Sequence, residues 1–139
     1  MTTHRIATEW QEKMAFDVEV DGFHLLVDAA PEHGGTDQGP RPKPLLLAAL
    51  AGCTGMDVVS ILTKMREPLR HFRVVVEGDL AEGHPAYYQK TRILYEFGAA
   101  DGLDPAKVER AVNLSQDRYC GVSAMLRKAT ELSFEIRYV

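Results

Sequence analysis

The longest apolar stretch of the chain runs from Pro44 to Met65 and reads PLLLAALAGCTGMDVVSILTKM. Up to Asp57, apolar residues would occupy every face of a helix formed by this stretch, and Pro68 follows it as a stop signal. This pattern predicts a buried central helix. Roughly 22 residues at about 1.5 Å each make a rod on the order of 33 Å long, about the diameter of a small domain.

We interpret this stretch as the interior helix of a soluble protein and not as a membrane span. Its uncharged part, residues 44–56, is shorter than the roughly 20 residues that a helix needs to cross a bilayer. Gly52 and Gly55 each cost about 1 kcal/mol relative to Ala inside a helix. We therefore expect another backbone to approach the helix closely at these two glycines.

Alternating apolar and polar residues predict strands on the N-terminal side of this helix. Residues 5–10 alternate weakly, whereas Phe16–Val20 and Phe23–Asp28 alternate clearly on either side of Asp21 and Gly22. An Asp-Gly pair favours the positive φ angles of a tight type I′ turn. The sequence therefore predicts a β-hairpin at this place.

The chain after the helix alternates between strand and helix patterns. Period two returns at residues 72–76 and again at residues 88–98, which together predict a second antiparallel hairpin. Residues 104–116 begin with an Asp-Pro pair that suits a helix N-terminus and carry one apolar stripe. Helical spacing recurs over residues 122–129, and residues 132–138 alternate as a final strand.

The predicted element order is therefore βββ-α-ββ-αα-β, an α+β fold in which antiparallel sheets wrap a long buried central helix. A chain of 139 residues is one domain's worth, so we expect a single domain over residues 1–139. A small sheet covers only one side of a helix, yet this helix is apolar all round. The economical solution is a homodimer in which two central helices pack together.

Charge and composition narrow the partners and the compartment. The net charge is −4, and 16 Lys and Arg residues are scattered among 20 acidic residues without a basic run. Nucleic acid and anionic membranes are therefore not expected as partners. The N-terminus, MTTHRIATEW, has no apolar region typical of a secretory signal, so we expect a cytoplasmic protein. Two cysteines in a reducing compartment argue against a structural disulfide framework.

Most sequence motifs of catalysis and metal binding are absent. The chain has no Gly-rich phosphate loop, no GxSxG, no HExxH and no CxxC, and its five histidines lack ligand spacing. We therefore expect no metal site. Asp57 lies one helical turn beyond Cys53 and has two interpretations, a general base for that thiol or the start of the solvated end of the helix.

Cys53 and Cys120 also have two interpretations. Free cysteines are often buried and pack as small apolar residues, which would explain both positions without any chemistry. Cys120, however, stands at the predicted N-terminus of a helix, where the dipole favours an anion, and Arg118 is nearby. Cys53 lies in mid-helix, so its thiolate would need a cation from elsewhere.

The segment that enters the central helix could supply that cation. Residues 29–43 are rich in Gly and Pro and predict a long loop, which we interpret as a candidate lid beside Cys53. Arg41 and Lys43 in this loop are the basic residues nearest to Cys53 in the sequence. Solvated loop residues are the equally simple alternative for both.

Two runs of sequence carry a resemblance to a known family. GPRPKPLLLAALAGCTGMDVVSILTKMR, followed downstream by DRYCGVSAMLRKATELSFEIRYV, resembles the OsmC/Ohr family of osmotically inducible and organic hydroperoxide resistance proteins. The resemblance implies an intertwined homodimer with two sites at its interface and an antioxidant, stress-response role. It implies thiol-dependent reduction of organic hydroperoxides, with Cys53 as the peroxidatic and Cys120 as the resolving cysteine. It further implies no cofactor beyond an external thiol reductant.

The chain departs from this family at one place. The family commonly has a Glu shortly after the proline that opens the central helix, where it orients an Arg toward the thiolate. Here that place reads Pro42-Lys43-Pro44 and has no acid. Arg41 is the nearest match to the family's arginine, and Lys43 is a second source of positive charge, although it lacks the planar fork of an arginine.

Three functions therefore remain open at the level of the sequence. The first is a two-cysteine peroxidase that acts on organic hydroperoxides. The second is a non-catalytic OsmC-like dimer that binds an apolar small molecule in its interfacial crevice, with both cysteines only packing. The third is a thioesterase-like fold, which would place a carboxylate or polar nucleophile on the interior helix and has no use for Cys120.

Overall fold

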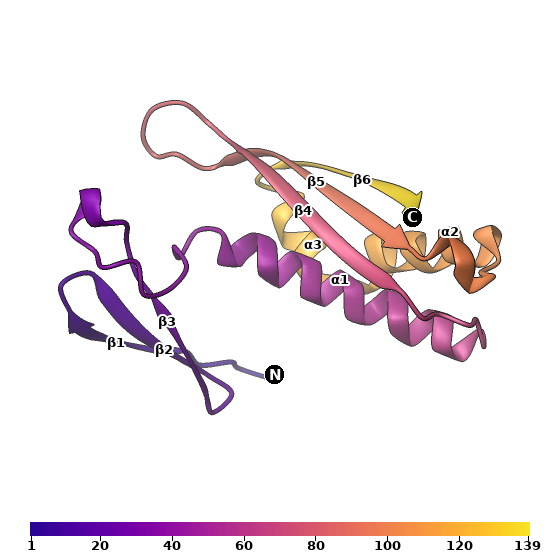
Figure 1. Ribbon diagram of the computed structural model, residues 1–139, viewed down its shortest axis with the longest axis horizontal. Coiled ribbons are helices and arrows are strands. Elements are labelled where there is room, and N and C mark those ends of the chain that lie inside the picture. The colour runs from indigo at the N-terminus through magenta and orange to yellow at the C-terminus, as the bar shows by residue number, and fades with distance from the viewer. The chain divides into compact units, whose positions relative to one another are not determined.

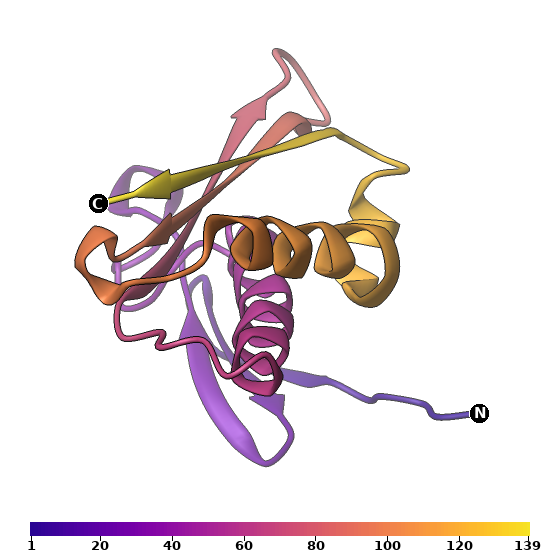
Figure 2. The same cartoon turned by 90° about the vertical axis from the view of Figure 1, so that its right-hand side faces the viewer.

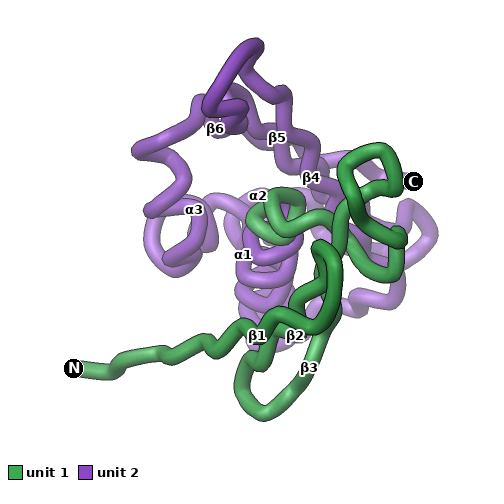
Figure 3. The backbone as a smooth tube through the Cα atoms, turned by 90° about the vertical axis from the view of Figure 1, so that its left-hand side faces the viewer, with its two compact units in different colours: residues 1–46 green, residues 47–139 purple.

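The computed structural model describes all residues from Met1 to Val139. The chain forms two compact units, Met1–Leu46 and Leu47–Val139, which Figure 3 shows in two colours. The element order follows the sequence prediction, with three strands, a long helix, two strands, two helices and a last strand. That the two units make up one domain stays a prediction.

The first unit is built on a three-stranded antiparallel sheet. Its strands are β1 (Ala7–Glu12), β2 (Ala15–Val20) and β3 (Phe23–Val27), paired in that order. Asp21 and Gly22 join β2 to β3 with φ angles of 53° and 81°. The predicted hairpin and its turn are confirmed, because both central residues have the left-handed backbone that a type I′ turn requires.

One buried carboxylate organises the loop that follows β3. Asp28 is 3% exposed, and its oxygens accept hydrogen bonds from the Ala29 N–H at 2.7 Å, the Gln38 N–H at 3.1 Å and the Thr36 hydroxyl at 3.0 Å. The backbone N–H donors lower the pKa of Asp28. Apart from a 3₁₀ turn at Pro31–His33, the loop has no helix or strand, as predicted.

Helix α1 spans Leu45–Lys64 and is the predicted central helix. Only one of its faces is covered within its unit, and the fully covered residues recur every fourth position: Leu50, Thr54, Val58 and Leu62. On another face, Met56 is 76% exposed and Val59 is 42% exposed. The second unit alone therefore leaves part of this apolar helix open, as expected if a second surface covers it.

The length and composition of α1 alone would let it cross a membrane. It has 20 residues and is apolar over most of that length, so the uncharged segment at residues 44–56 is shorter than the apolar helix itself. The core helix of a soluble protein meets the same criterion, and the buried face of α1 contacts the other elements of its unit. The interior-helix interpretation accounts for these contacts.

The second sheet contains β4 (Phe72–Leu80), β5 (Tyr88–Phe97) and β6 (Glu131–Tyr138), with β5 in the centre. β4 and β5 form the predicted antiparallel hairpin. β6, in contrast, runs parallel to β5, so the expectation of purely antiparallel sheets is wrong for this pair. The reason is that the two helices between β5 and β6 form a crossover, which returns the chain to the end where β5 began.

The crossover opens with a 3₁₀ turn, Ala99–Asp101, and continues through three further short elements. Helix α2 (Pro105–Leu114) begins at Asp104, whose carboxylate caps the Ala106 N–H at 3.0 Å as the sequence predicted. A single π-helical turn, Ser115–Tyr119, then leads to α3 (Gly121–Leu126). Figures 1 and 2 show α1 and α2 on the same side of the second sheet.

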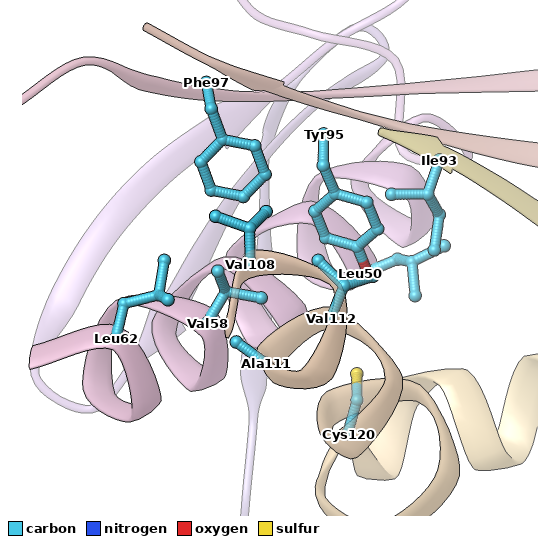
Figure 4. Close-up of a cluster of buried hydrophobic side chains, with 10 residues drawn as sticks. All are labelled: Leu50, Val58, Leu62, Ile93, Tyr95, Phe97, Val108, Ala111, Val112 and Cys120. Carbon is cyan, nitrogen blue, oxygen red and sulfur yellow. The ribbon is translucent and has the colours of Figure 1, made fainter. Parts of the chain in front are cut away.

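The core of the second unit lies between α1, α2 and β5. Its buried side chains, drawn in Figure 4, come from all three elements, and the thiol of Cys120 lies at the edge of the group. They are Leu50, Val58, Leu62, Ile93, Tyr95, Phe97, Val108, Ala111, Val112 and Cys120. The π-helical turn and α3 are thereby held next to the middle of α1.

Candidate functional site

The fold brings the two cysteines together from distant parts of the sequence. Cys53 lies in the middle of α1 and is half-buried, and Cys120 is the N-cap residue of α3 and only 3% exposed. Both are free thiols, and Cys120 lies close enough to Cys53 to raise the pKa of its thiol. Both residues were candidate site residues in the sequence analysis, and the fold brings them close together.

The first turn of α3 lies next to both cysteines. The backbone N–H of Ser123 donates to Sγ of Cys120 at 3.3 Å, and the backbone N–H of Val122 is near enough to Cys53 to influence the pKa of its thiol. The N–H of Cys120 itself donates to the carbonyl oxygen of Ser115 at 2.8 Å. The thiol pair is therefore fixed to the backbone that connects the π-helical turn to α3.

Burial raises the pKa of the Cys53 thiol, because desolvation disfavours the thiolate. The N–H of Val122 lowers this pKa, whereas the neighbouring Cys120 and the charge of Asp57 raise it further. The net effect is a pKa above the ordinary value for a thiol. No cation is among these influences, although a nearby positive charge is what lowers the pKa of a reactive thiol.

The predicted cations lie in the first unit. Nη1 of Arg41 donates to Oδ1 of Asp37 at 2.7 Å and to the carbonyl oxygen of Gly39 at 3.2 Å. Lys43 is exposed. The role of Arg41 or Lys43 beside the Cys53 thiolate stays a prediction, since these contacts tie Arg41 only to its own loop.

A buried network of polar side chains next to Cys53 was missed by the sequence reasoning. Oγ1 of Thr54 lies 2.6 Å from the hydroxyl of Tyr95 and 2.7 Å from Oγ of Ser115. Nε2 of Gln116 donates to the hydroxyl of Tyr95 at 2.7 Å, and Oγ of Ser115 donates to Oδ2 of Asp57 at 2.9 Å. A threonine in an apolar helix, directly after the cysteine, was the one signal available.

Two cavities flank α1 in the second unit. One has a volume of about 520 Å³ and combines apolar side chains with the carboxylate of Asp57, its lining being Asp57, Ser60, Ile61, Lys64, Met65, Leu114 and Tyr119. Asp57 is therefore not simply a solvated helix end, and its role as a general base for Cys53 stays a prediction. It accepts a hydrogen bond from Ser115 and faces a cavity.

The other cavity, of about 470 Å³, lies between α1 and β4 and is mostly apolar. Its lining includes Gly52 and Gly55, together with Met56, Val59, Ser60, Phe72 and Val74. A Cβ atom added to Gly52 would meet no atom within 4 Å, and one at Gly55 would meet only Cγ2 of Val74, at 3.5 Å. The close approach expected at these glycines therefore does not occur within the chain.

Comparison with known proteins decides the family. A family model described as OsmC-like protein matches residues 35–135, which include both cysteines. The chain belongs to the OsmC-like family. Protein YhfA of Escherichia coli (strain K12) is 33% identical to it over 131 residues, covering 92% of this chain and 94% of that protein.

Solved structures of other proteins share the fold of this OsmC-like chain. A hypothetical protein from Aquifex aeolicus VF5 is 26% identical with a TM-score of 0.82, and the match covers 100% of this chain and 99% of that one. An organic hydroperoxide resistance protein OsmC from Legionella pneumophila has a TM-score of 0.71 at 16% identity, covering 100% and 98% of the two chains. The predicted OsmC-like α+β fold is confirmed.

Proposed function

We propose that this OsmC-like protein reduces organic hydroperoxides with its two cysteines, Cys53 attacking the peroxide and Cys120 resolving the product. The observation that carries the proposal is that the fold brings the two thiols together from separate helices: Cys53 packs against the buried cluster that contains Cys120, and Ser115, which bonds the N–H of Cys120, also bonds Thr54 next to Cys53. The family and the name of the Legionella structure, an organic hydroperoxide resistance protein, support the same chemistry.

The reaction balances with one peroxide and two thiols. The Cys53 thiolate attacks one oxygen of the O–O bond, which forms an S–O bond and releases an alkoxide that takes up a proton as the alcohol. Cys53 is then a sulfenic acid. The Cys120 thiol attacks its sulfur, water leaves, and a disulfide forms. An external thiol reduces the disulfide by exchange, and no metal or organic cofactor takes part in any step.

The proposal needs a positive charge beside Cys53, and none is among the influences on the pKa of its thiol. Arg41 in the loop before α1 is our choice for this charge, and Lys43 is the second choice. A cation would counteract the burial and the Asp57 charge that raise the pKa of the Cys53 thiol. We propose that the reductant is a small-molecule or protein thiol and that the protein works in the reducing cytoplasm.

We also propose that the active form is a homodimer. α1 exposes Met56 and Val59 next to the apolar cavity that Gly52 and Gly55 line. Contact with a second copy of the chain would cover these side chains and would give the two glycines the close neighbour that the single chain lacks. A site at such an interface would enclose a bulky apolar hydroperoxide better than an open surface would.

Substitution of each cysteine tests the proposed roles. Cys53→Ser should abolish consumption of cumene hydroperoxide, because a hydroxyl is a far poorer nucleophile at neutral pH. Cys120→Ser should consume about one equivalent per subunit and leave Cys53 as a trappable sulfenic acid, which excess peroxide converts to sulfinic acid. Mass spectrometry reads each state. If neither substitution alters peroxide consumption, the two-cysteine mechanism is wrong.

Two observations favour the alternative of a non-catalytic binding module. The raised pKa of Cys53 leaves little thiolate at neutral pH, which disfavours catalysis, and the cavity beside Gly52 and Gly55 is apolar, which suits an apolar ligand. In this case an apolar dye should bind with micromolar affinity while hydroperoxide is not consumed. Val59→Asp, at the wall of that cavity, should then abolish dye binding and leave both thiols equally slow to oxidise.

A further inference from the structure

The two ends of the polar network beside Cys53 fix the direction of its hydrogen bonds. Nη2 of Arg127 donates to Oε1 of Gln116 at 3.1 Å, and because a guanidinium only donates, the amide nitrogen of Gln116 must face the other way. That nitrogen meets the hydroxyl of Tyr95. At the opposite end, the carboxylate of Asp57 accepts from Ser115. One end of the network is thus a cation and the other an anion.

The hydroxyl groups between these ends have one proton each, so their order follows. Ser115 gives its proton to Asp57 and must accept from Thr54 at 2.7 Å. Thr54 gives its proton to Ser115 and must accept from Tyr95 at 2.6 Å. Tyr95 then accepts from Gln116. Every hydrogen bond in this network is donated in the same direction, from Arg127 toward Asp57, and the proton of each hydroxyl group is used.

The middle of this hydrogen-bond network is inaccessible to water. Thr54, Tyr95 and Ser115 are fully buried, and Gln116 is 3% exposed. Removing the Thr54 hydroxyl would leave the proton of the Tyr95 hydroxyl without an acceptor and Ser115 without a donor, and no water could replace it in this buried place. The hydrogen bonds of the network therefore depend on one another.

The position of the chain gives it a role for the thiol pair. Thr54 directly follows Cys53 on α1, and Ser115 and Gln116 open the π-helical turn that ends at Cys120. The carbonyl oxygen of Ser115 also accepts the N–H of Cys120 at 2.8 Å. We infer that the hydrogen-bond chain from Arg127 to Asp57 holds Cys120 against Cys53, with Thr54 as its central positioning residue.

This inference rests on the proposed function for its use in catalysis, but its test needs no hydroperoxide. Glutathione disulfide oxidises the thiol pair to the Cys53–Cys120 disulfide and releases two molecules of glutathione. The equilibrium constant of this exchange measures how readily one thiol meets the other. A hydrogen-bond network that holds the thiols together reduces the entropy lost when the disulfide forms. Breaking this network should therefore lower the equilibrium constant of the exchange.

Thr54→Val removes the central hydroxyl at nearly constant shape. We expect the equilibrium constant to fall about tenfold or more, the factor that corresponds to about 1.4 kcal/mol. Thr54→Ser keeps the hydroxyl and should remain within about twofold of the wild type by this reasoning. Thr63→Val is the matched control on the same helix, because Thr63 is exposed and bonds only its own helix at Val59. It should leave the constant unchanged.

The outcomes separate this inference from the proposed function. A Thr54→Val variant with the wild-type constant overturns the positioning role, and so does a Thr54→Ser variant that falls as far as Thr54→Val. If Thr54→Val does not fold, Tyr95→Phe removes the neighbouring hydroxyl, keeps the buried ring, and should lower the constant in the same way. A wild type that ignores hydroperoxide while these variants still shift the constant refutes the peroxidase and supports the positioning chain.

Discussion

Gly52 offers the sharpest test of whether a second chain covers α1. In the single chain, a Cβ atom at this position meets nothing within 4 Å, and the position lines an open apolar cavity. A larger side chain would therefore fit a monomer without strain. In a homodimer joined through α1, the same side chain would enter a close helix contact. The substitution Gly52→Leu thus has opposite effects in the two cases.

The magnitudes follow from helix propensity and packing. Replacing a helical glycine by leucine gains about 1 kcal/mol of helix stability when nothing else changes. Forcing several methylene groups into a packed contact costs typically 1–3 kcal/mol or more. We expect the dimer to lose stability, so that Gly52→Leu dissociates at concentrations where the wild type is dimeric and unfolds at lower urea. Analytical ultracentrifugation and urea unfolding at one fixed protein concentration measure both effects.

A matched control places the same side chain on another exposed helix. Glu109→Leu on α2 adds a leucine to a solvent-facing position outside the proposed interface and should change stability by no more than about 0.5 kcal/mol. The dimer argument is refuted if Gly52→Leu is about 1 kcal/mol more stable than the wild type and keeps the same sedimentation coefficient. That result would mean that α1 is open to solvent at Gly52.

The remaining predictions concern charge. If Arg41 or Lys43 stabilises the Cys53 thiolate, replacing that residue by Ala should raise the pKa of the thiol and slow its alkylation by iodoacetamide near pH 7. Unchanged alkylation rates in both Arg41→Ala and Lys43→Ala would mean that the loop only connects β3 to α1. In the wild type, the alkylation rate should still be rising above the ordinary pH range of a thiol, because the pKa of Cys53 is raised. Asp101 accepts two backbone N–H groups from residues 70–71, which lower its pKa, so its stabilising effect is present above the usual carboxyl pKa and lost as pH falls through the lowered one. Asp101→Asn should therefore lower the urea midpoint at pH 7 and narrow its difference from the wild type in acid.

The elements that the sequence predicted correctly have local causes. α1 follows from an apolar run longer than any strand needs, ended by proline, and the first hairpin follows from Asp21 and Gly22, which adopt the positive φ angles that the turn requires. The cap at Asp104 likewise depends only on neighbouring residues. Each of these features is decided within a few residues, so a periodic pattern is enough to find it.

The features that the sequence did not predict depend on distant partners. β6 alternates like any strand, and nothing in its own residues tells whether its neighbour runs parallel or antiparallel. Thr54 looks like one small residue among the alanines and glycines of α1. Its importance appears only when β5 brings Tyr95 and the π-helical turn brings Ser115 and Gln116 to it. Buried polar networks are properties of the packed fold and have no local signature.

The surroundings of Cys53 limit what the second unit can do alone. A thiol of ordinary pKa is only a few per cent thiolate at neutral pH, and each unit by which the pKa rises costs a further factor of about ten in thiolate. Burial and the charge of Asp57 raise the pKa of Cys53, and the N–H of Val122 opposes them only in part. If Cys53 reduces peroxides as proposed, a positive charge beside it would have to restore the thiolate. The chain has no acid at the place where the family orients its arginine, so a cation such as Arg41 would be held by other contacts, for example its bond to Asp37.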